Sequence, residues 1–315
     1  MTPDLRALAD RQYGVVTRRQ ALRRGMTERQ LKTATQPRGE WVVVRRGAYA
    51  ERWEWDAADD ARHHLMRVMA VSLVARKAYV LSHSSAAVVH RLDCRPHWRE
   101  LVHVSHPGVL GGRTEGGVKH HPAAVPENEQ LVVGGLGVTS LARTAVDIAR
   151  EYGIEDGVVA CDQALRRGVP RSGLYDVLAR MRSWPNVTLG RAAVRLADPG
   201  AENLAESLAR MLVIELGFGT PSTQVWIEDG GRRVRVDLIL NGHIFEFDGK
   251  VMYTGEFGAG TEVLWREKER EDWLRSLGFG ISRIVWSDLF GPARRAALKR
   301  LAREYLATQA RHGAR

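Results

Sequence analysis

The fold of the C-terminal part is decided by the stretch Val234-Arg235-Val236-Asp237-Leu238-Ile239-Leu240-Asn241-Gly242-His243-Ile244-Phe245-Glu246-Phe247-Asp248. The Asn-Gly dipeptide at its centre separates two alternating runs, which is a strong signal for a β-hairpin closed by a type I′ turn. With this dipeptide as the two-residue loop, Leu238 lies opposite Phe245 and Asp237 lies opposite Glu246. The hairpin is therefore predicted to have one apolar face and one charged face.

The charged face carries acids that lie close to one another. Like charges directly opposed across a strand pair, at a Cβ separation of about 4.5–5.5 Å, are destabilising. A divalent cation between them removes that repulsion, and Mg²⁺ prefers oxygen ligands. We therefore expect Asp237 and Glu246 to bind Mg²⁺ (or Mn²⁺), with Asp248 as a third oxygen donor on the same face. The alternative is a solvent-facing surface on which Arg235 and Lys250 balance the acids.

A helix is predicted upstream of this hairpin, from Ala201 to Leu216, because leucines recur at every fourth residue and Gly217 follows. Glu202 and Glu206 are four residues apart and would share one face of that helix. Either of them could lean over the hairpin and add a fourth acid.

This order of motifs resembles the Vsr-like branch of the PD-(D/E)XK endonucleases. The stretches that carry the resemblance are AESLARMLVIELGF, VDLIL, FEFDGK and LWREKEREDWLRSLGFGISRIVWSDLF. The resemblance implies a restriction-endonuclease-like α/β sandwich over residues 201–315, with a mixed central sheet and flanking helices. It also implies that Glu206, Asp237 and Glu246 bind Mg²⁺ and that the domain hydrolyses phosphodiester bonds.

One position departs from the usual pattern of these endonucleases. Asp248 stands where many members have the lysine of a Glu-x-Lys pair, as in the Vsr-like branch itself. Lys250 on the same strand face, or Lys268 on the following charged helix, could take the part of that lysine. Similar substitutions occur in inactive members, so the resemblance leaves activity open.

The first fifty residues have a strong basic excess and a regular succession of short elements. They hold eleven basic and four acidic side chains, although the whole chain has a net charge of only +10. The stretches Thr17–Gln20 and Thr27–Gln30 both have the spacing of a helix capping box. Trp41–Val44 and Gly47–Ala50 then flank a basic turn. This order of three helices and a hairpin predicts a winged helix-turn-helix.

In a winged helix-turn-helix, one helix enters the major groove and the wing lies along the phosphate backbone. We therefore expect residues 1–52 to bind DNA, since a local basic excess is typical of a protein with a polyanionic partner. The expected DNA-binding residues are Arg18, Arg19, Arg29, Lys32, Arg45 and Arg46. The alternative is a small helical domain with incidental arginines.

The N-terminal stretches GVVTRRQALRRGMTERQL and RRGAYA resemble the N-terminal domain of AbiEi-type antitoxins of abortive-infection systems. The resemblance implies DNA binding, often at the protein's own promoter. Further along, SHSSAAVVH and VTSLARTAVDIA resemble the middle region of the same antitoxin-like proteins. We therefore expect a middle α+β domain over residues 55–185.

Most histidines of the chain lie between His63 and His121, which raises the question of a metal site. His63-His64 and His120-His121 are adjacent pairs, and neighbours on a strand point to opposite faces. No His-x-x-x-His or carboxylate spacing organises them. A structural or polar-surface role is therefore favoured over metal binding.

The bulk properties set the remaining expectations. A chain of 315 residues predicts two or three domains, here in a multi-domain α/β arrangement, with a linker at residues 186–200 between Pro185 and Pro199. Cys94 and Cys161 stand too far apart for a disulfide framework or a cysteine zinc site. No apolar run reaches the length of a membrane span. We therefore expect a cytoplasmic protein without membrane contact.

Two hypotheses follow for the function. The first is a DNA-binding, Mg²⁺-dependent endonuclease in a defence, mobile-element or toxin–antitoxin setting. The alternative is a transcriptional regulator or antitoxin whose nuclease-like domain is catalytically inactive. DNA is the expected partner in both, and a toxin or antitoxin partner protein and a homodimer stay open.

Overall fold

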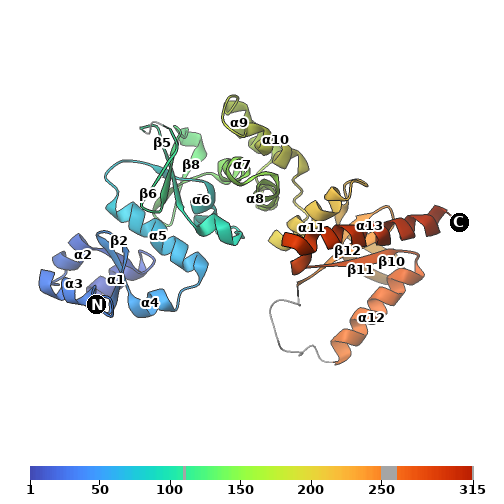
Figure 1. Ribbon diagram of the computed structural model, residues 1–315, viewed down its shortest axis with the longest axis horizontal. Helices are drawn as coiled ribbons and strands as arrows, with labels where there is room; N and C mark the ends of the chain where they lie inside the picture. Colours follow the sequence, from blue (N-terminus) through green and yellow to red (C-terminus); the bar gives the residue numbers. More distant parts are fainter. Residues whose placement is uncertain (109–110, 250–260, 314–315) are drawn as a thin grey trace. The chain divides into compact units, whose positions relative to one another are not determined.

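The computed structural model describes residues 1–108, 111–249 and 261–313 (Figure 1). The chain divides into two compact units. The N-terminal unit comprises Met1–Ala160 and Val169–Ala192, and the C-terminal unit comprises Cys161–Gly168 and Ala193–Arg315. None of the described helices is both long enough and apolar enough to cross a membrane.

The first elements of the N-terminal unit form the predicted succession of helices and a hairpin. They are α1 (Pro3–Asp10), β1 (Val15–Thr17), α2 (Arg18–Arg23), α3 (Glu28–Ala34), β2 (Trp41–Arg45) and β3 (Ala48–Glu51). The three strands form an antiparallel sheet in the order β1-β3-β2. Both capping boxes are confirmed, because Thr17 and Thr27 each exchange hydrogen bonds with the glutamine three residues on.

The winged-helix elements do not have a core entirely of their own. Helix α4 (Arg52–Asp56) leads into α5 (Asp60–Val74), which contacts all three strands of the small sheet. Val15 and Ala50 of that sheet lie in one hydrophobic cluster with Met66 of α5 and Val104 of the next sheet. Residues 1–52, which we expected as a separate domain, therefore share a core with the region that follows, because α5 is apolar on more than one side.

The second sheet of the N-terminal unit has six strands in the order β6-β7-β5-β4-β9-β8. Their bounds are β4 (Val80–Leu81), β5 (Val102–His106), β6 (Arg113–Glu115), β7 (Val118–Pro122), β8 (Gln130–Val133) and β9 (Leu136–Thr139). Strands β5 and β7 run parallel, with Ser105 paired to His121. Because alternate residues share a face, His103 and His121 lie on the same side of the sheet.

Helices complete this unit and connect it to the C-terminal one. They are α6 (His83–Val89), η1 (Pro96–Arg99), η2 (Glu127–Glu129), α7 (Leu141–Tyr152), α8 (Ile154–Arg166), α9 (Arg171–Arg180) and α10 (Val187–Leu196). The segment 186–200, which we expected to be a linker, is therefore largely helical. Its two flanking prolines stand outside α10, so nothing in the segment interrupts the helix.

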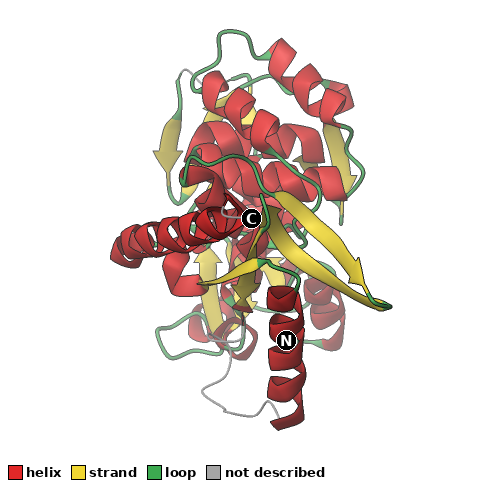
Figure 2. Cartoon of the chain, turned by 90° about the vertical axis from the view of Figure 1, so that its right-hand side faces the viewer, coloured by secondary structure: helices red, strands yellow, loops and turns green. Residues whose placement is uncertain are grey.

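The C-terminal unit contains a four-stranded mixed sheet in the order β10-β11-β12-β13. Its elements are α11 (Leu204–Glu215), β10 (Ser222–Asp229), β11 (Arg232–Leu240), β12 (His243–Asp248), α12 (Thr261–Ser276), β13 (Gly280–Val285), η4 (Trp286–Leu289) and α13 (Gly291–Gly313). Strands β12 and β13 are parallel, and the other neighbours are antiparallel. Helices α11 and α13 cover one face and α12 the other (Figure 1), while the long β10 and β11 arrows stand out in Figure 2.

The predicted hairpin is confirmed at its turn. Asn241 and Gly242 have φ values of 46° and 75°, as a type I′ turn requires at both central positions. Leu238 pairs with Phe245, as the sequence predicts. The β11–β12 pairing extends from the turn to this pair, and β12 then continues alongside β13.

Candidate functional site

The winged helix presents a basic surface on α3. Leu31 points into the small core and is 4% exposed, whereas Arg29 and Lys32 on the other side of the helix are exposed. Arg19 and Arg46 are exposed as well. Four of the six predicted DNA-binding side chains are thus exposed.

The other two predicted DNA-binding residues have protein partners. Arg18 is exposed and forms an ion pair with Glu28 at the start of α3. Arg45 is half-buried, and its Nη1 donates a hydrogen bond of 2.8 Å to the carbonyl of Gly116 in the β6–β7 turn. Arg45 therefore connects the small wing to the six-stranded sheet, which the sequence of the wing alone could not indicate.

Glu206 lies in the first turn of α11 and is 9% exposed. Its Oε2 accepts hydrogen bonds from the backbone nitrogen of Glu202 at 2.8 Å and from Gln224 at 3.0 Å. Its Oε1 accepts one from Asn203 at 2.7 Å. Glu202 precedes the helix and its carboxylate is paired with Arg235 at 2.6 Å. Of the two candidates, Glu206 is therefore the one turned inward.

Asp237 lies near Glu206 without pairing directly with Glu246. Its Oδ2 accepts a hydrogen bond of 3.0 Å from the backbone nitrogen of Phe247, so the side chain of Asp237 continues the hairpin where the backbone ladder ends. Burial raises the pKa of Asp237 above its ordinary value. Burial also raises the pKa of Glu206, and the Asp237 carboxylate adds to that rise. These two acids are thus electrostatic neighbours.

Glu246 is held by an arginine of α12. Both of its oxygens accept from Arg270, at 2.7 Å and 2.5 Å. Such a bidentate pair is the strongest arrangement that a carboxylate and a guanidinium adopt. Arg270 also donates to Glu267 on its own helix at 2.8 Å. The positive charge that the sequence assigned to a metal ion is therefore provided, at Glu246, by a side chain of the protein.

The remaining predicted residues lie around this pair. The Asp248 carboxylate is 3.6 Å from Arg283 of β13. Lys268 is exposed on α12. Lys250 lies outside the described residues.

The acid set does not fit a shared Mg²⁺ as it stands. Glu206 and Glu246 have protein donors on both oxygens, and Glu206, Asp237 and Glu246 do not bring their ligand oxygens together within 4.8 Å. Among residues 1–108, 111–249 and 261–313, one group of three metal-ligating side chains meets that spacing, and it consists of histidines. Glu206, Asp237 and Glu246 therefore do not form one metal site in this arrangement.

Comparisons with known proteins bear on the N-terminal unit. Residues 3–52 match the family described as "Transcriptional regulator, AbiEi antitoxin". This confirms the AbiEi-type domain expected at the N-terminus. Two uncharacterized proteins of Mycobacterium tuberculosis, from strains CDC 1551 / Oshkosh and ATCC 25618 / H37Rv, are each 29% identical to this chain over 250 residues. The aligned region covers 79% of this chain and 89% of each relative.

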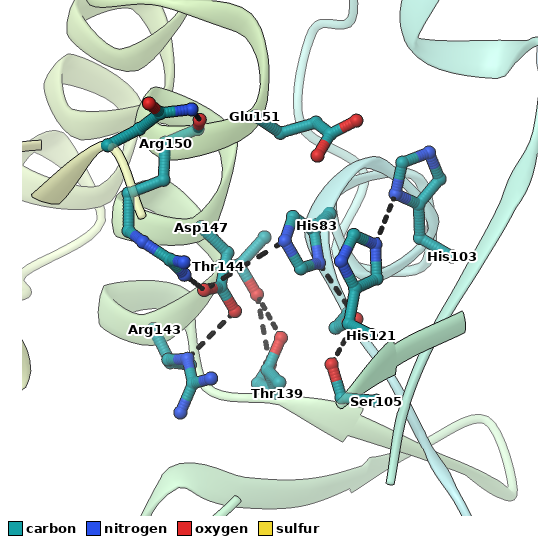
Figure 3. Close-up of polar contacts among 12 residues, drawn as sticks. His83, His103, Ser105, His121, Thr139, Arg143, Thr144, Asp147, Arg150 and Glu151 are labelled. Carbon is teal, nitrogen blue, oxygen red and sulfur yellow. Dashed lines mark hydrogen bonds and ion pairs between the residues drawn. The ribbon is translucent and has the colours of Figure 1, made fainter. Parts of the chain in front are cut away.

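Beyond the AbiEi-type domain, the six-stranded sheet carries a cluster of histidines, for which the sequence favoured a structural or polar-surface role. His83, His103 and His121 converge there, from α6, β5 and β7 (Figure 3). Burial lowers the pKa of His103 to about 2 and that of His121 to about 3, so both rings are neutral at pH 7. His120 and His121 point to opposite faces of the sheet, as expected for neighbours on a strand. Each still has a histidine partner on β5, because His120 lies beside His106 and His121 lies beside His103.

The signal that could have found this cluster is the spacing within each strand. Each of the two strands supplies one histidine ring to each face of the sheet. On β5 these are His103 and His106, and on β7 they are His121 and His120. The parallel pairing of β5 with β7 brings His103 and His121 together, and α6 adds His83. No short sequence pattern specifies either of these contacts.

Proposed function

We propose that the protein is a DNA-binding transcriptional regulator of the AbiEi antitoxin type, acting in a toxin–antitoxin setting with a toxin as its protein partner. One observation carries this proposal. The residues that match the AbiEi family, 3–52, are those that form the winged helix, and α3 of that winged helix exposes Arg29 and Lys32.

The physical argument follows from the shape and charge of α3. A short helix with one buried leucine and basic residues on its outer side suits insertion into the major groove. Arg29 and Lys32 are three residues apart and lie on one face of the helix. Arg19 and Arg46 add exposed charge from α2 and the wing, where phosphate contacts would fix the register on the duplex. The protein's own promoter is the expected DNA.

In this proposal the C-terminal unit is a nuclease-like module that does not cut. The bidentate Arg270–Glu246 pair supports this, because it neutralises the acid that would otherwise demand a cation. The unit would then serve as an interaction surface for the partner protein.

A second candidate function, a Mg²⁺-dependent endonuclease, is favoured by a separate observation. Glu206 and Asp237 are electrostatic neighbours with raised pKa values, beside a mixed sheet with helices on both faces. Perturbed acids in such a position are typical of functional sites. Cleavage would require Arg270 to release Glu246, so the two candidates differ in a measurable way.

DNA binding is tested by fluorescence anisotropy with a duplex of the promoter region at several salt concentrations. The variant Arg29→Ala, Lys32→Ala should weaken binding by about 1–3 kcal/mol for each base contact that is lost, and it should lower the preference for the promoter over an unrelated duplex. The matched control is Arg182→Ala, Arg195→Ala, which removes two exposed charges outside the winged helix. An equal loss in both variants would contradict binding through α3.

Cleavage is tested with supercoiled plasmid in Mg²⁺, Mn²⁺ or EDTA. The regulator proposal predicts intact plasmid under all three conditions with promoter binding retained. Metal-dependent nicking by the wild type, absent from an Asp237→Ala, Glu246→Ala variant, would overturn it in favour of the endonuclease.

A further inference from the structure

Three histidine rings meet on one face of the six-stranded sheet. His83 and His103 are 3% and 2% exposed, and His121 is half-buried. The rings of His83 and His121 stack with centroids 3.7 Å apart, and His103 Nδ1 lies 3.0 Å from His121 Nε2. Burying three imidazoles against one another, rather than against apolar side chains, is costly unless their nitrogens have partners.

The separations match those of a metal site. In a tetrahedral zinc site with Zn–N bonds of about 2.0–2.1 Å, neighbouring ligand nitrogens are about 3.4 Å apart. The observed ligand atoms of all three histidines lie within 4.8 Å of one another. Shortening the longer of these separations towards that value would let the three nitrogens share one ion.

The outer nitrogens of two of the rings are held by hydrogen bonds. Tyr152 Oη lies 3.1 Å from His103 Nε2, which leaves His103 Nδ1 directed at His121. Ser82 Oγ lies 2.9 Å from His83 Nδ1. Fixing the second ring nitrogen in this way is how proteins orient histidines that bind a metal through the first.

The backbone at His83 is strained in a way that serves this arrangement. His83 has a φ of 51°, a left-handed conformation at the first residue of α6. Side chains other than glycine adopt it at a cost of about 1–2 kcal/mol. Residues held in such conformations cluster at functional sites. Here the conformation places the ring of His83 against that of His121 (Figure 3).

Three cations near the rings, Lys119, Arg143 and Arg150, each form an ion pair with an acid. Lys119, the nearest cation on β7, is paired with Glu151. Arg143 and Arg150 both pair with Asp147, which is fully buried. An Asp147 oxygen lies 4.0 Å from His83 Nε2, so a carboxylate faces the cluster from α7 (Figure 3).

We propose that His83, His103 and His121 form a binding site for a borderline divalent transition metal, Zn²⁺ in the first place. Imidazole nitrogens suit zinc, copper and nickel, whereas Mg²⁺ requires oxygen ligands. Three histidines leave a fourth position, and the partial exposure of His121 lets a water molecule fill it. Bound metal connects α6, β5 and β7 and so stabilises the N-terminal unit.

The test uses the full chain, stripped of metal with EDTA and dialysed against Zn²⁺, with Co²⁺ as a spectroscopic probe. The wild type should bind one equivalent of Zn²⁺ at the histidines and give the visible absorption of tetrahedral Co²⁺. His121→Gln should lose that absorption and weaken Zn²⁺ binding by more than about 100-fold. Tyr152→Phe should weaken it by about 10- to 100-fold, the range for losing a ligand's hydrogen-bond partner.

The matched control is His106→Gln, His120→Gln, which removes two histidines from the opposite face of the same strands. It should bind Zn²⁺ and Co²⁺ as the wild type does. Circular dichroism checks that each variant is folded, and His83→Gln repeats the test on α6 if His121→Gln is not. Co²⁺ absorption that survives in folded His121→Gln, or that is lost equally in the control, would overturn the proposal, as would a wild type that binds no Zn²⁺.

Discussion

The two clusters of ligand-type side chains in this protein are built in opposite ways. The acids of the C-terminal unit are neighbours in sequence, with Asp237 and Glu246 on one hairpin, yet Glu246 is paired with an arginine of another element. The histidines of the N-terminal unit are spread over His83 to His121, yet they meet ring to ring. The acids, which are close in sequence, were therefore predicted to share a site, although Glu246 has an arginine as its partner. The histidines, which are distant in sequence, were not predicted to share one, although their rings converge.

The difference lies in what each cluster has for partners. Around Glu246 a cation of the chain is within reach, because α12 carries arginines and glutamates along its length. Around the histidines the cations are already paired with acids. The histidines are neutral and the cations around them are already paired, so they are free to bind an external ion. Glu246 is less able to do so, because Arg270 already neutralises it.

The largest expected effect is a loss of unfolding free energy, and it should be greater for an ion pair near the histidines than for the one at Glu246. Asp147→Ala should lower the free energy of unfolding by about 3–5 kcal/mol, because it removes the buried carboxylate that pairs with both Arg143 and Arg150 and leaves Arg143 with Glu129. Glu246→Ala removes a half-buried pair and should cost about 1 kcal/mol. Urea unfolding at pH 7 measures both. Equal losses would mean that the ion pairs near the histidines and those near the acids contribute equally to the free energy of unfolding.

A pH experiment compares one neutral buried histidine in each unit. Burial lowers the pKa of His64 and of His243 from 6.5 to about 4. The neutral ring of His243 forms hydrogen bonds with the hydroxyl groups of Thr308 and Ser282, both at 2.8 Å. The folded state binds its proton less readily than the unfolded state, so this stability is present above pH 6.5 and is lost as the pH falls towards 4.

The expected loss is roughly 2 kcal/mol per histidine between pH 7 and pH 5, because each pH unit in this window corresponds to about 1.4 kcal/mol. Urea unfolding at both pH values, for the wild type and His243→Gln, isolates the share of His243. The variant should depend less on pH even though it is less stable overall. An identical pH dependence in the two proteins would show that His243 does not stay neutral.

Local features of the fold could be predicted from the sequence because their causes are local. The two capping boxes and the Asn-Gly turn each rest on residues within four positions of one another. The alternation of the hairpin likewise predicts that Val236 and Leu238 are buried. The AbiEi resemblance of the first fifty residues rests on the same short-range pattern.

The rest depends on contacts that no short pattern encodes. The pairing of Glu246 with Arg270 requires a particular rotation of α12, and that helix is charged on several sides. The histidine cluster requires β7 to pair in parallel with β5. The shared core of α5 with the winged helix arises because α5 is apolar on more than one side. Each depends on which elements pack together, and hydrophobic periodicity does not specify that.

A smaller effect tests the turn that brings the acids onto one hairpin. Asn241 has a φ of 46°, and its side chain donates to Tyr305 at 2.9 Å. Asn241→Ala should cost about 2 kcal/mol, because alanine tolerates the left-handed conformation poorly and also loses the hydrogen bond to Tyr305. Asn241→Gly keeps that conformation and loses only the hydrogen bond, so it should cost about 1 kcal/mol. If urea unfolding gave the reverse order, the turn would not be what fixes this hairpin.

The variant with the smallest expected loss of stability is the most direct test of the acid cluster. Arg270→Gln should lower the free energy of unfolding by about 1 kcal/mol or less, since the pair is partly exposed. It leaves Glu246 without its guanidinium, so the affinity for Mn²⁺, measured by electron paramagnetic resonance, should rise about tenfold, equivalent to about 1.4 kcal/mol. Arg275→Gln is the control, because Arg275 pairs with Glu271 on the same helix.

Each outcome of that measurement assigns a role to Arg270. A rise in Mn²⁺ affinity confined to Arg270→Gln, with the plasmid left intact, fits a regulator whose acids are permanently neutralised. The same rise accompanied by nicking would make Arg270 the group that masks a nuclease, and the acids would then be as complete a ligand set as the histidines. No rise at all would mean that the acids lack the geometry for a cation even when freed, because Glu206 keeps its own donors at 2.7–3.0 Å.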